Sequence, residues 1–282
     1  MYNPKYTKAF YNAYGEAEWS RLEATPYGRL QAIIHNDFIL KYLKSGDRVL
    51  DAGSGPGRFS ISVARAGGNV TVVDISDKQL EIAKQKIAEA GLLDRIEKFI
   101  EGDILDLSMF ADGHFDMVMC FGGALSYVYE KRQKAAKELM RVTRRGGMIL
   151  VSVMSRLGAI LGVARQPDIP TLQDPDKSEP GRPALWGVWE TGDLPGFPSR
   201  RANMMHASMH LFKAEELTSL FKECEMLEIA GSNVTIREYS PVNEQLAANP
   251  SVWSTVVELE KKLNHDPGLV NSGSHIIMAV KK

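Results

Sequence analysis

The chain has 282 residues, 44% of them hydrophobic, which is enough for one large domain or for one domain with an elaborate cap. Its 34 basic and 35 acidic residues give a formal net charge of -1, so no polyanion footprint favours nucleic acid as a partner. No stretch approaches the roughly 20 apolar residues that span a bilayer, and two cysteines do not make a disulfide scaffold. We expect a cytoplasmic protein without a membrane or nucleic-acid partner, and the sequence leaves its oligomeric state open.

Residues 48–154 alternate short apolar runs with helical patterns, and this alternation predicts a parallel sheet with crossover helices. A helix should follow the first strand, and another should begin after Ser76, which precedes Gln79 in a capping-box arrangement. The fold class is therefore α/β, with a doubly wound and mostly parallel sheet. The expected strands are 49–50, 69–73, 95–100, 115–119 and 148–153, and a further helix is expected at 131–144.

The composition changes after the fifth expected strand. Seven of the 13 prolines lie between Gln166 and Ser199, together with Trp186 and Trp189. A long irregular segment inside a compact domain is usually functional or disordered, and the tryptophans argue against disorder. We expect residues 155–210 to form a cap at the sheet edge with the tryptophans as walls, and a packing excursion or an oligomer contact is the alternative. The later expected elements are a helix at 214–223, a strand at 226–234, a helix from Pro250 and a strand at 275–280. The last strand should be antiparallel and should bring the sheet to seven strands.

The strongest chemical signal is the glycine-rich run Val-Leu-Asp-Ala-Gly-Ser-Gly-Pro-Gly at residues 49–57. Glycines let a backbone turn sharply and approach a ligand without a Cβ in the way. The run joins a strand to a helix, which is where Rossmann-type folds bind ligands. Its spacing is G-x-G-x-G rather than the dinucleotide spacing G-x-G-x-x-G. The residues expected at the ligand are Asp51, Gly53, Ser54 and Gly55.

Two further strand ends carry carboxylates. Asp74 ends the second expected strand, where a carboxylate can accept hydrogen bonds from both hydroxyls of a ribose. Gly102, Asp103 and Ile104 end the third strand. Asp103 can accept a hydrogen bond from an adenine amine, while Ile75 and Ile104 sandwich the ring. Because the carboxyl ends of parallel strands meet at one edge, these residues predict a single nucleoside site.

With these motifs the chain resembles class I methyltransferases that depend on S-adenosyl-L-methionine (SAM). The glycine-rich run matches the family's first motif, Val-Val-Asp-Ile-Ser at 72–76 its acidic second strand, and Glu-Gly-Asp-Ile at 101–104 its adenine segment. Phe-Asp-Met-Val-Met-Cys at 115–120 matches the fourth strand, and residues 141–150 match the approach to the fifth. The resemblance covers residues 45–154. It implies a Rossmann-like fold, SAM as cofactor and methyl transfer as activity.

The resemblance also assigns residues to the methionine end of SAM. Phe121 and Gly122 follow the fourth strand, and the glycine allows the backbone to come close to the ligand. That segment lacks the Asp/Asn-Pro-Pro-Tyr motif of enzymes that methylate amines on nucleobases or glutamine. Residues 11–21 resemble the lid helix of small-molecule members, in which an aromatic residue, here Tyr11, covers the cofactor. Arg21 suits the methionine carboxylate, although a solvated arginine on a helix face would look the same in the sequence.

On the acceptor side, a general base is needed only if the nucleophile arrives protonated. His206 and His210 flank Ser208, and in an extended chain these three side chains share one face. That face, together with Tyr127, is our candidate for catalysis. The other interpretations are the polar outer face of an edge strand and a metal pair, for which no third ligand is evident. Tyr239 is a further candidate base.

We expect methyl transfer from SAM to an oxygen or nitrogen of a small-molecule acceptor by in-line displacement, without a bound metal. Three alternatives remain open: a SAM-binding regulatory or assembly protein without transfer activity, an RNA methyltransferase, and a nicotinamide oxidoreductase, against which the glycine spacing speaks. The expected organisation is a helical lid at 1–44, a SAM-binding core at 45–154, the cap at 155–210 and the C-terminal part of the core sheet at 211–282.

Overall fold

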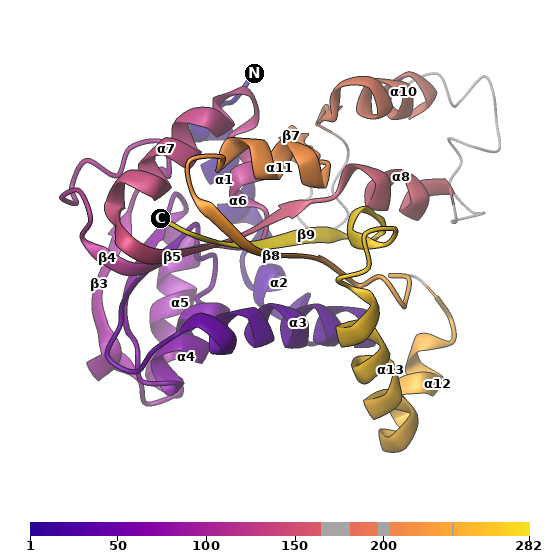
Figure 1. Ribbon diagram of the computed structural model, residues 1–282, viewed down its shortest axis with the longest axis horizontal. Coiled ribbons are helices and arrows are strands. Elements are labelled where there is room, and N and C mark those ends of the chain that lie inside the picture. The colour runs from indigo at the N-terminus through magenta and orange to yellow at the C-terminus, as the bar shows by residue number, and fades with distance from the viewer. Residues whose placement is uncertain (165–180, 197–203, 239) are drawn as a thin grey trace.

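The computed structural model of the protein describes residues 1–164, 181–196, 204–238 and 240–282. Its centre is a seven-stranded sheet with the strand order β3-β2-β1-β4-β5-β9-β8 (Figure 1). Of these seven strands, β9 alone runs antiparallel to its neighbours β5 and β8. This confirms the predicted seven-stranded, mostly parallel sheet. In spatial order the strands are β3 (Ile96–Glu101), β2 (Asn69–Asp74), β1 (Arg48–Ala52), β4 (Phe115–Cys120), β5 (Thr143–Met154), β9 (His275–Lys281) and β8 (Glu225–Ser232).

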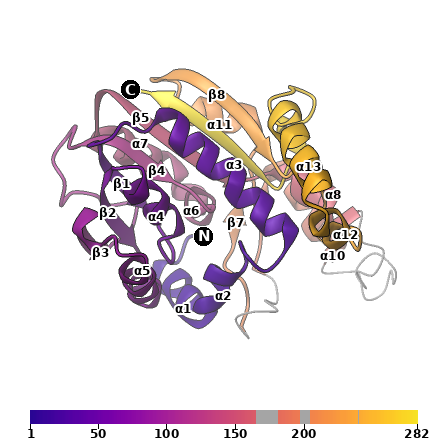
Figure 2. The same cartoon turned by 90° about the horizontal axis from the view of Figure 1, so that it is seen from below.

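Helices cover both faces of the sheet, which explains why its central strands are apolar almost throughout. One face buries Leu30 and Ile34 of the first of these helices, and the opposite face buries Leu139 and Leu217. On the first face lie α3 (Pro26–Tyr42), α4 (Arg58–Arg65) and α5 (Asp77–Glu89) (Figure 2). On the second lie α6 (Ala124–Tyr127), α7 (Arg132–Val142) and α11 (Ala214–Leu220). We predicted a lid over residues 1–44, but α3 belongs to the layer that covers the sheet. The lid therefore consists only of the two helices that precede α3.

Those two helices, α1 (Pro4–Tyr14) and α2 (Glu16–Ser20), are held by the start of α5. The Ser76 hydroxyl accepts the Gln79 N–H at 3.0 Å, so Ser76 is the predicted N-cap. The Gln79 amide does not close a capping box, because it donates instead to the carbonyls of Tyr11 and Gly15, each at 3.0 Å. Gln79, five residues after the end of β2, therefore anchors the lid.

The cap that follows β5 comprises, within the described residues, α8 (Arg156–Ala164), α10 (Gly181–Thr191) and the short strands β6 (Asp193–Leu194) and β7 (Met209–His210). A small apolar cluster ties it to the sheet edge through Val188 and Met209 of the cap and Tyr127 of α6. Trp186 and Trp189 are 60% and 50% exposed, and neither lines the two cavities described below. The tryptophan walls that we expected are therefore not formed. Residues 165–180 and 197–203, with most of the cap's prolines, and Tyr239 lie outside the described residues.

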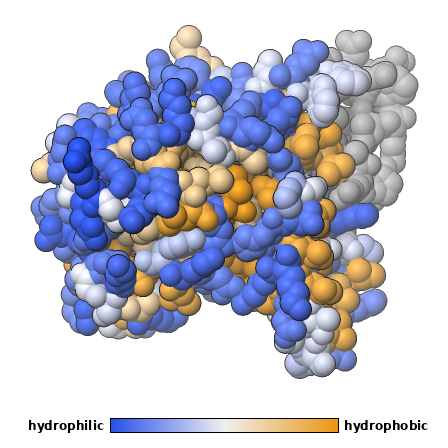
Figure 3. Space-filling model, in the orientation of Figure 1, coloured by the Kyte–Doolittle hydropathy of each residue, from blue (hydrophilic) through white to orange (hydrophobic). Residues whose placement is uncertain are grey.

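Near the end of β8, α12 (Asn243–Ala248) and α13 (Pro250–Leu263) project from the sheet beside α3 (Figures 1 and 2). Pro250 begins α13 as predicted, and the Asn249 side chain caps this helix. Within the described ranges, every helix falls short of the length and apolar composition needed to cross a membrane. Three single turns of 3-10 helix are η1 (Leu93–Arg95), η2 (Tyr129–Lys131) and η3 (Val270–Ser272). Figure 3 shows apolar side chains at the surface along β8 and over α13, among them Met226, Leu227, Leu259 and Leu263.

The carboxylate of Glu260 in α13 holds the chain that follows β8. It is fully buried and accepts the backbone N–H groups of Val234 and Thr235, each at 2.9 Å. Glu260→Ala leaves both donors unpaired, and we expect the free energy of unfolding in urea to fall by about 2–4 kcal/mol. The exposed Glu258→Ala on the same helix is the control, and should change that energy by less than about 0.5 kcal/mol. Equal stabilities of the two variants would contradict this role of Glu260.

Candidate functional site

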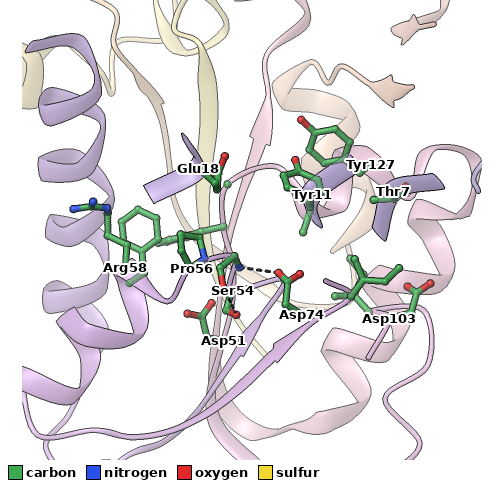
Figure 4. A pocket seen from close by; sticks show the side chains of 18 of the residues that line it. Thr7, Tyr11, Glu18, Asp51, Ser54, Pro56, Arg58, Asp74, Asp103 and Tyr127 are labelled. Carbon is green, nitrogen blue, oxygen red and sulfur yellow. Dashed lines mark hydrogen bonds between the residues drawn. The ribbon is translucent and has the colours of Figure 1, made fainter. Parts of the chain in front are cut away.

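Hydrogen bonds between two neighbouring strand ends organise the site. The Asp74 carboxylate at the end of β2 accepts the Gly55 N–H at 2.7 Å and the Ser76 N–H at 2.8 Å. The turn after β1 reaches Asp74 because Gly55 has a φ of +53°, a conformation that L side chains rarely adopt. A Cβ on Gly55 would meet only the Glu18 side chain, at 3.8 Å, so this face of the turn is open to a cavity (Figure 4).

A second carboxylate, Asp51 of β1, lies beneath the same turn and is 1% exposed. The Ser60 hydroxyl donates to it at 2.6 Å. Burial is the main reason why the pKa of Asp51 is raised to about 7, and the nearby charge of Asp74 adds to the shift. Burial likewise raises the pKa of Asp74 to about 6. Burial thus disfavours the charged form of both carboxylates despite their donors, and further donors from a ligand in the cavity would stabilise that form.

Asp103 follows β3 and lines the cavity together with Ile75 and Ile104. One of its oxygens accepts the Leu105 N–H at 2.9 Å, and the other accepts the Tyr2 hydroxyl at 2.8 Å. Tyr2 was not expected here, because no local pattern marks a contact between residues 101 positions apart. A ligand amine at Asp103 has to share this carboxylate with Tyr2 or displace it.

The lid contributes a pair of opposite charges. Arg21 Nε lies 2.7 Å from Glu18 Oε1, and their side chains are only 19% and 14% exposed. A Cβ on Gly122, which follows β4, would lie 3.7 Å from the Arg21 guanidinium. Arg21 is therefore not a solvated arginine on a helix face. Tyr11 from α1 and Tyr127 from α6 stand side by side next to this pair (Figure 4).

The structure brings every predicted cofactor residue to one cavity. They are Tyr11, Arg21, Asp51, Gly53, Ser54, Gly55, Asp74, Ile75, Gly102, Asp103, Ile104, Phe121 and Gly122. Sequence reasoning missed several residues that line the same cavity, among them Tyr2, Thr7, Glu18, Leu22, Arg58 and Phe59. Most of the missed residues come from the lid or from the helix after the turn, where single positions carry no recognisable motif.

Of the predicted catalytic residues, the structure brings together Tyr127 and His206 but not His210. The Tyr127 hydroxyl lies 3.4 Å from His206 Nε2, and both residues line a second cavity beside the first. His210 is 1% exposed, lines neither cavity, and pairs through Nδ1 with Asp193 at 2.7 Å. The expected common face fails because only Met209–His210 of this stretch is a strand, so the side chains of residues 206–210 do not alternate regularly.

Comparison with known proteins places the cavity in context. Residues 49–147 match the family model described as "Methyltransferase domain". The chain is 32% identical over 161 residues, 55% of this chain and 57% of the relative, to a malonyl-[acyl-carrier protein] O-methyltransferase of Pectobacterium atrosepticum. It is 30% identical over 120 residues, 42% of this chain and 45% of the relative, to the ubiquinone/menaquinone biosynthesis C-methyltransferase UbiE of Pseudomonas putida. The chain thus spans about half the length of these curated relatives.

A solved structure of a SAM-dependent methyltransferase from Methanosarcina mazei superposes with a TM-score of 0.55, at 18% identity, over 89% of this chain and 96% of that one. This likeness confirms the Rossmann-like methyltransferase fold. The segment that matches the methyltransferase-domain model, residues 49–147, thus lies in a chain with the Rossmann-like methyltransferase fold.

The matched segment contributes far more residues to the first cavity than to the second. It runs from β1 into β5 and contains Asp51, Asp74, Asp103 and Tyr127. The lid helices and the cap, including His206, lie outside it. The first cavity is therefore built mainly from the matched segment, and the second cavity mainly from segments that the family model does not match.

The raised pKa of Asp51 predicts a pH-dependent cost of its burial. Its folded-state pKa of about 7 exceeds the unfolded value near 3.8, so its ionisation destabilises the folded protein as pH rises between those values. Asp51→Asn keeps an acceptor for Ser60 and removes the ionisation. We expect the melting temperature of this variant minus that of the ligand-free wild type to be larger at pH 8 than at pH 5. A difference that does not change with pH, measured by calorimetry, would show that Asp51 is not perturbed.

Proposed function

We propose that the chain is a SAM-dependent methyltransferase that transfers a methyl group to an oxygen or nitrogen of a small molecule. The single observation that carries the SAM assignment is the arrangement of Asp103, Asp74 and the open glycine turn at the ends of the neighbouring strands β3, β2 and β1 around one cavity. A carboxylate at the end of β2 suits the ribose hydroxyls, and Asp103 suits the adenine amine, with Ile75 and Ile104 beside the ring.

The lid pair supports the same ligand. The methionine part of SAM carries an ammonium group and a carboxylate, and Glu18 and Arg21 offer one partner of each charge at the cavity wall. Two charges that are mostly removed from water gain from a ligand that supplies matching hydrogen-bonding groups. This fit argues for an amino-acid zwitterion at the β4 end of the cavity.

A bound SAM supplies an electrophilic methyl group on a positively charged sulfur. The protein then has to align the acceptor atom with that methyl group and keep water away. The lid suits this task, because α1 and α2 lie over the cavity and Tyr11 lines it together with Tyr127. The relatives include O- and C-methyltransferases, so they leave the acceptor atom open. Our choice of oxygen or nitrogen rests on the chemistry of the second cavity.

Removing Asp74 should weaken SAM binding selectively. Asp74→Ala deprives the ribose hydroxyls of their acceptor, and we expect the dissociation constant, measured by calorimetric titration, to rise about 5- to 150-fold, equivalent to about 1–3 kcal/mol. Asp94→Ala, an exposed carboxylate before β3, is the matched control and should bind SAM as the wild type does. Unchanged affinity in a folded Asp74→Ala protein would refute this assignment.

The same preparation tests transfer. Incubation with methyl-labelled SAM and a cellular metabolite extract should place the label in small molecules, with S-adenosylhomocysteine formed in equal amount. Label found only in RNA or protein would refute the small-molecule acceptor. Tight SAM binding without any transfer would favour a regulatory or assembly role instead.

A further inference from the structure

The second cavity, of about 280 Å³, adjoins the cofactor cavity. The two cavities share three wall residues, Tyr2, Thr7 and Tyr127, and so adjoin at these side chains. Its other walls come from the start of α1 and from the cap residues Met205 to Ser208. The volume is at the lower end of the range for small-molecule pockets, which suits a ligand of about one ring rather than a polymer or a carrier protein.

The described walls of this cavity favour a neutral occupant. The described lining residues include no Asp, Glu, Lys or Arg side chain. A carboxylate, phosphate or ammonium group here would lose its hydration without gaining a counter-charge. Four of the eleven described lining residues carry rings: Tyr2, Tyr6, Tyr127 and His206. A neutral aromatic ring therefore fits this cavity, since stacked and edge-to-face contacts with these rings are favourable.

The hydrogen bonds of His206 fix the state of its ring. Nδ1 lies 3.0 Å from the Ala207 carbonyl oxygen, which can only accept, so Nδ1 carries the proton. In the neutral ring Nε2 is then an acceptor, and it faces the Tyr127 hydroxyl at 3.4 Å. The ring is held between Phe10 and Tyr127, with centroids 4.5 and 5.7 Å away. Burial lowers the pKa of His206 and raises that of Tyr127, so the imidazole stays neutral and the phenol protonated at pH 7.

We propose, as an extension of the proposed methyl transfer, that this second cavity binds the acceptor, that the acceptor is a neutral phenol, and that Tyr127 passes its hydroxyl proton to His206 Nε2. The phenol lies against Tyr127, at the wall between the two cavities. His206 and Tyr127 are then the catalytic residues on the acceptor side.

The atoms and charges balance. A bond forms between the phenol oxygen and the methyl carbon while the carbon–sulfur bond breaks, and its electron pair stays on sulfur, which becomes a neutral thioether. The phenol proton goes to the Tyr127 oxygen as the Tyr127 proton goes to Nε2. The positive charge of the sulfonium donor thus reappears on the His206 imidazolium, which later releases its proton to water.

Acidity selects the phenol among hydroxyl acceptors. A buried imidazole is a weak base, with a pKa below the ordinary value of about 6.5. A phenol resembles a tyrosine side chain, with a pKa of about 10, so the proton transfer is uphill by an amount that a concerted reaction can absorb. Aliphatic alcohols are far weaker acids than phenols. Carboxylic acids would arrive ionised, needing no base and meeting no counter-charge in these walls.

The test uses the full chain, labelled SAM and three probes: 4-methylphenol, 4-nitrophenol, which is largely ionised at pH 8, and cyclohexanol. The wild type should form the methyl ether of 4-methylphenol and none from cyclohexanol. His206→Gln should lower kcat for 4-methylphenol about 10²- to 10⁴-fold at pH 8, the range for a lost general base. The 4-nitrophenolate should bind more weakly, with a higher KM, but it needs no base, so the variant should lower its kcat, measured at saturation, far less. Tyr127→Phe should show the same split.

Two controls separate this role from a structural one. SAM affinity of His206→Gln should equal that of the wild type, and His114→Gln, at the amino end of β4, should leave both phenol rates unchanged. Equal losses for both phenols, or turnover of cyclohexanol at a comparable rate, would overturn the base assignment. A protein that binds SAM but methylates none of the phenols overturns the acceptor class and leaves the proposed function standing. A protein that does not bind SAM overturns both.

Discussion

The hydrogen bond from the Gly55 N–H to the Asp74 carboxylate is the contact on which the site depends. It joins the turn after β1 to the end of β2 and so fixes two adjacent strand ends relative to each other. It also makes the burial of Asp74 tolerable, because a buried carboxylate needs donors and the turn supplies one. Without this turn geometry, which the positive φ of Gly55 permits, the carboxylate would lose the Gly55 N–H and keep donors only from its own strand end.

The lid takes its position from the same strand end. Ser76 donates its hydroxyl to Asn12 at 2.5 Å, and Gln79 donates to the carbonyls of Tyr11 and Gly15. These residues belong to the turn that begins at Asp74, whose carboxylate accepts the Ser76 N–H. A change at Asp74 is therefore transmitted to the lid within two hydrogen bonds. At the other end of the cavity, the Tyr2 hydroxyl ties the start of the lid to Asp103.

The sequence was sufficient for the cofactor half because that half is made of local motifs. Each of its carboxylates ends a strand, and a strand end followed by a turn is recognisable from the pattern of apolar residues alone. The parallel arrangement then brings Asp51, Asp74 and Asp103 together without any further information. This is why all 13 predicted residues line one cavity, while their contact with a cofactor stays a prediction.

The residues of the second cavity were harder to predict, because their contacts join distant segments and one of these segments is irregular. Tyr127 and His206 meet across 79 positions, and the segment that carries His206 is not a strand. The alternation rule therefore had no basis there, and it wrongly placed His210 beside His206. Of the charge pair, Arg21 was predicted and Glu18 was not. Nothing in the sequence distinguishes Glu18 from any other glutamate on a short helix, and only the structure shows that it faces the cavity.

The two cavities differ in how firmly the fold constrains their walls. The strand ends that hold the cofactor are fixed by the sheet, because any shift of β1 or β2 would break the contacts between Asp74, Gly55 and Ser76. The walls of the second cavity come from one end of α1 and a short cap segment, which contact the core mainly through one small apolar cluster that includes Tyr127. Substitutions in these walls can change the shape and polarity of the second cavity at little cost to the sheet. Tyr127 is the exception, because it belongs to both cavities, so a change there alters the two cavities together.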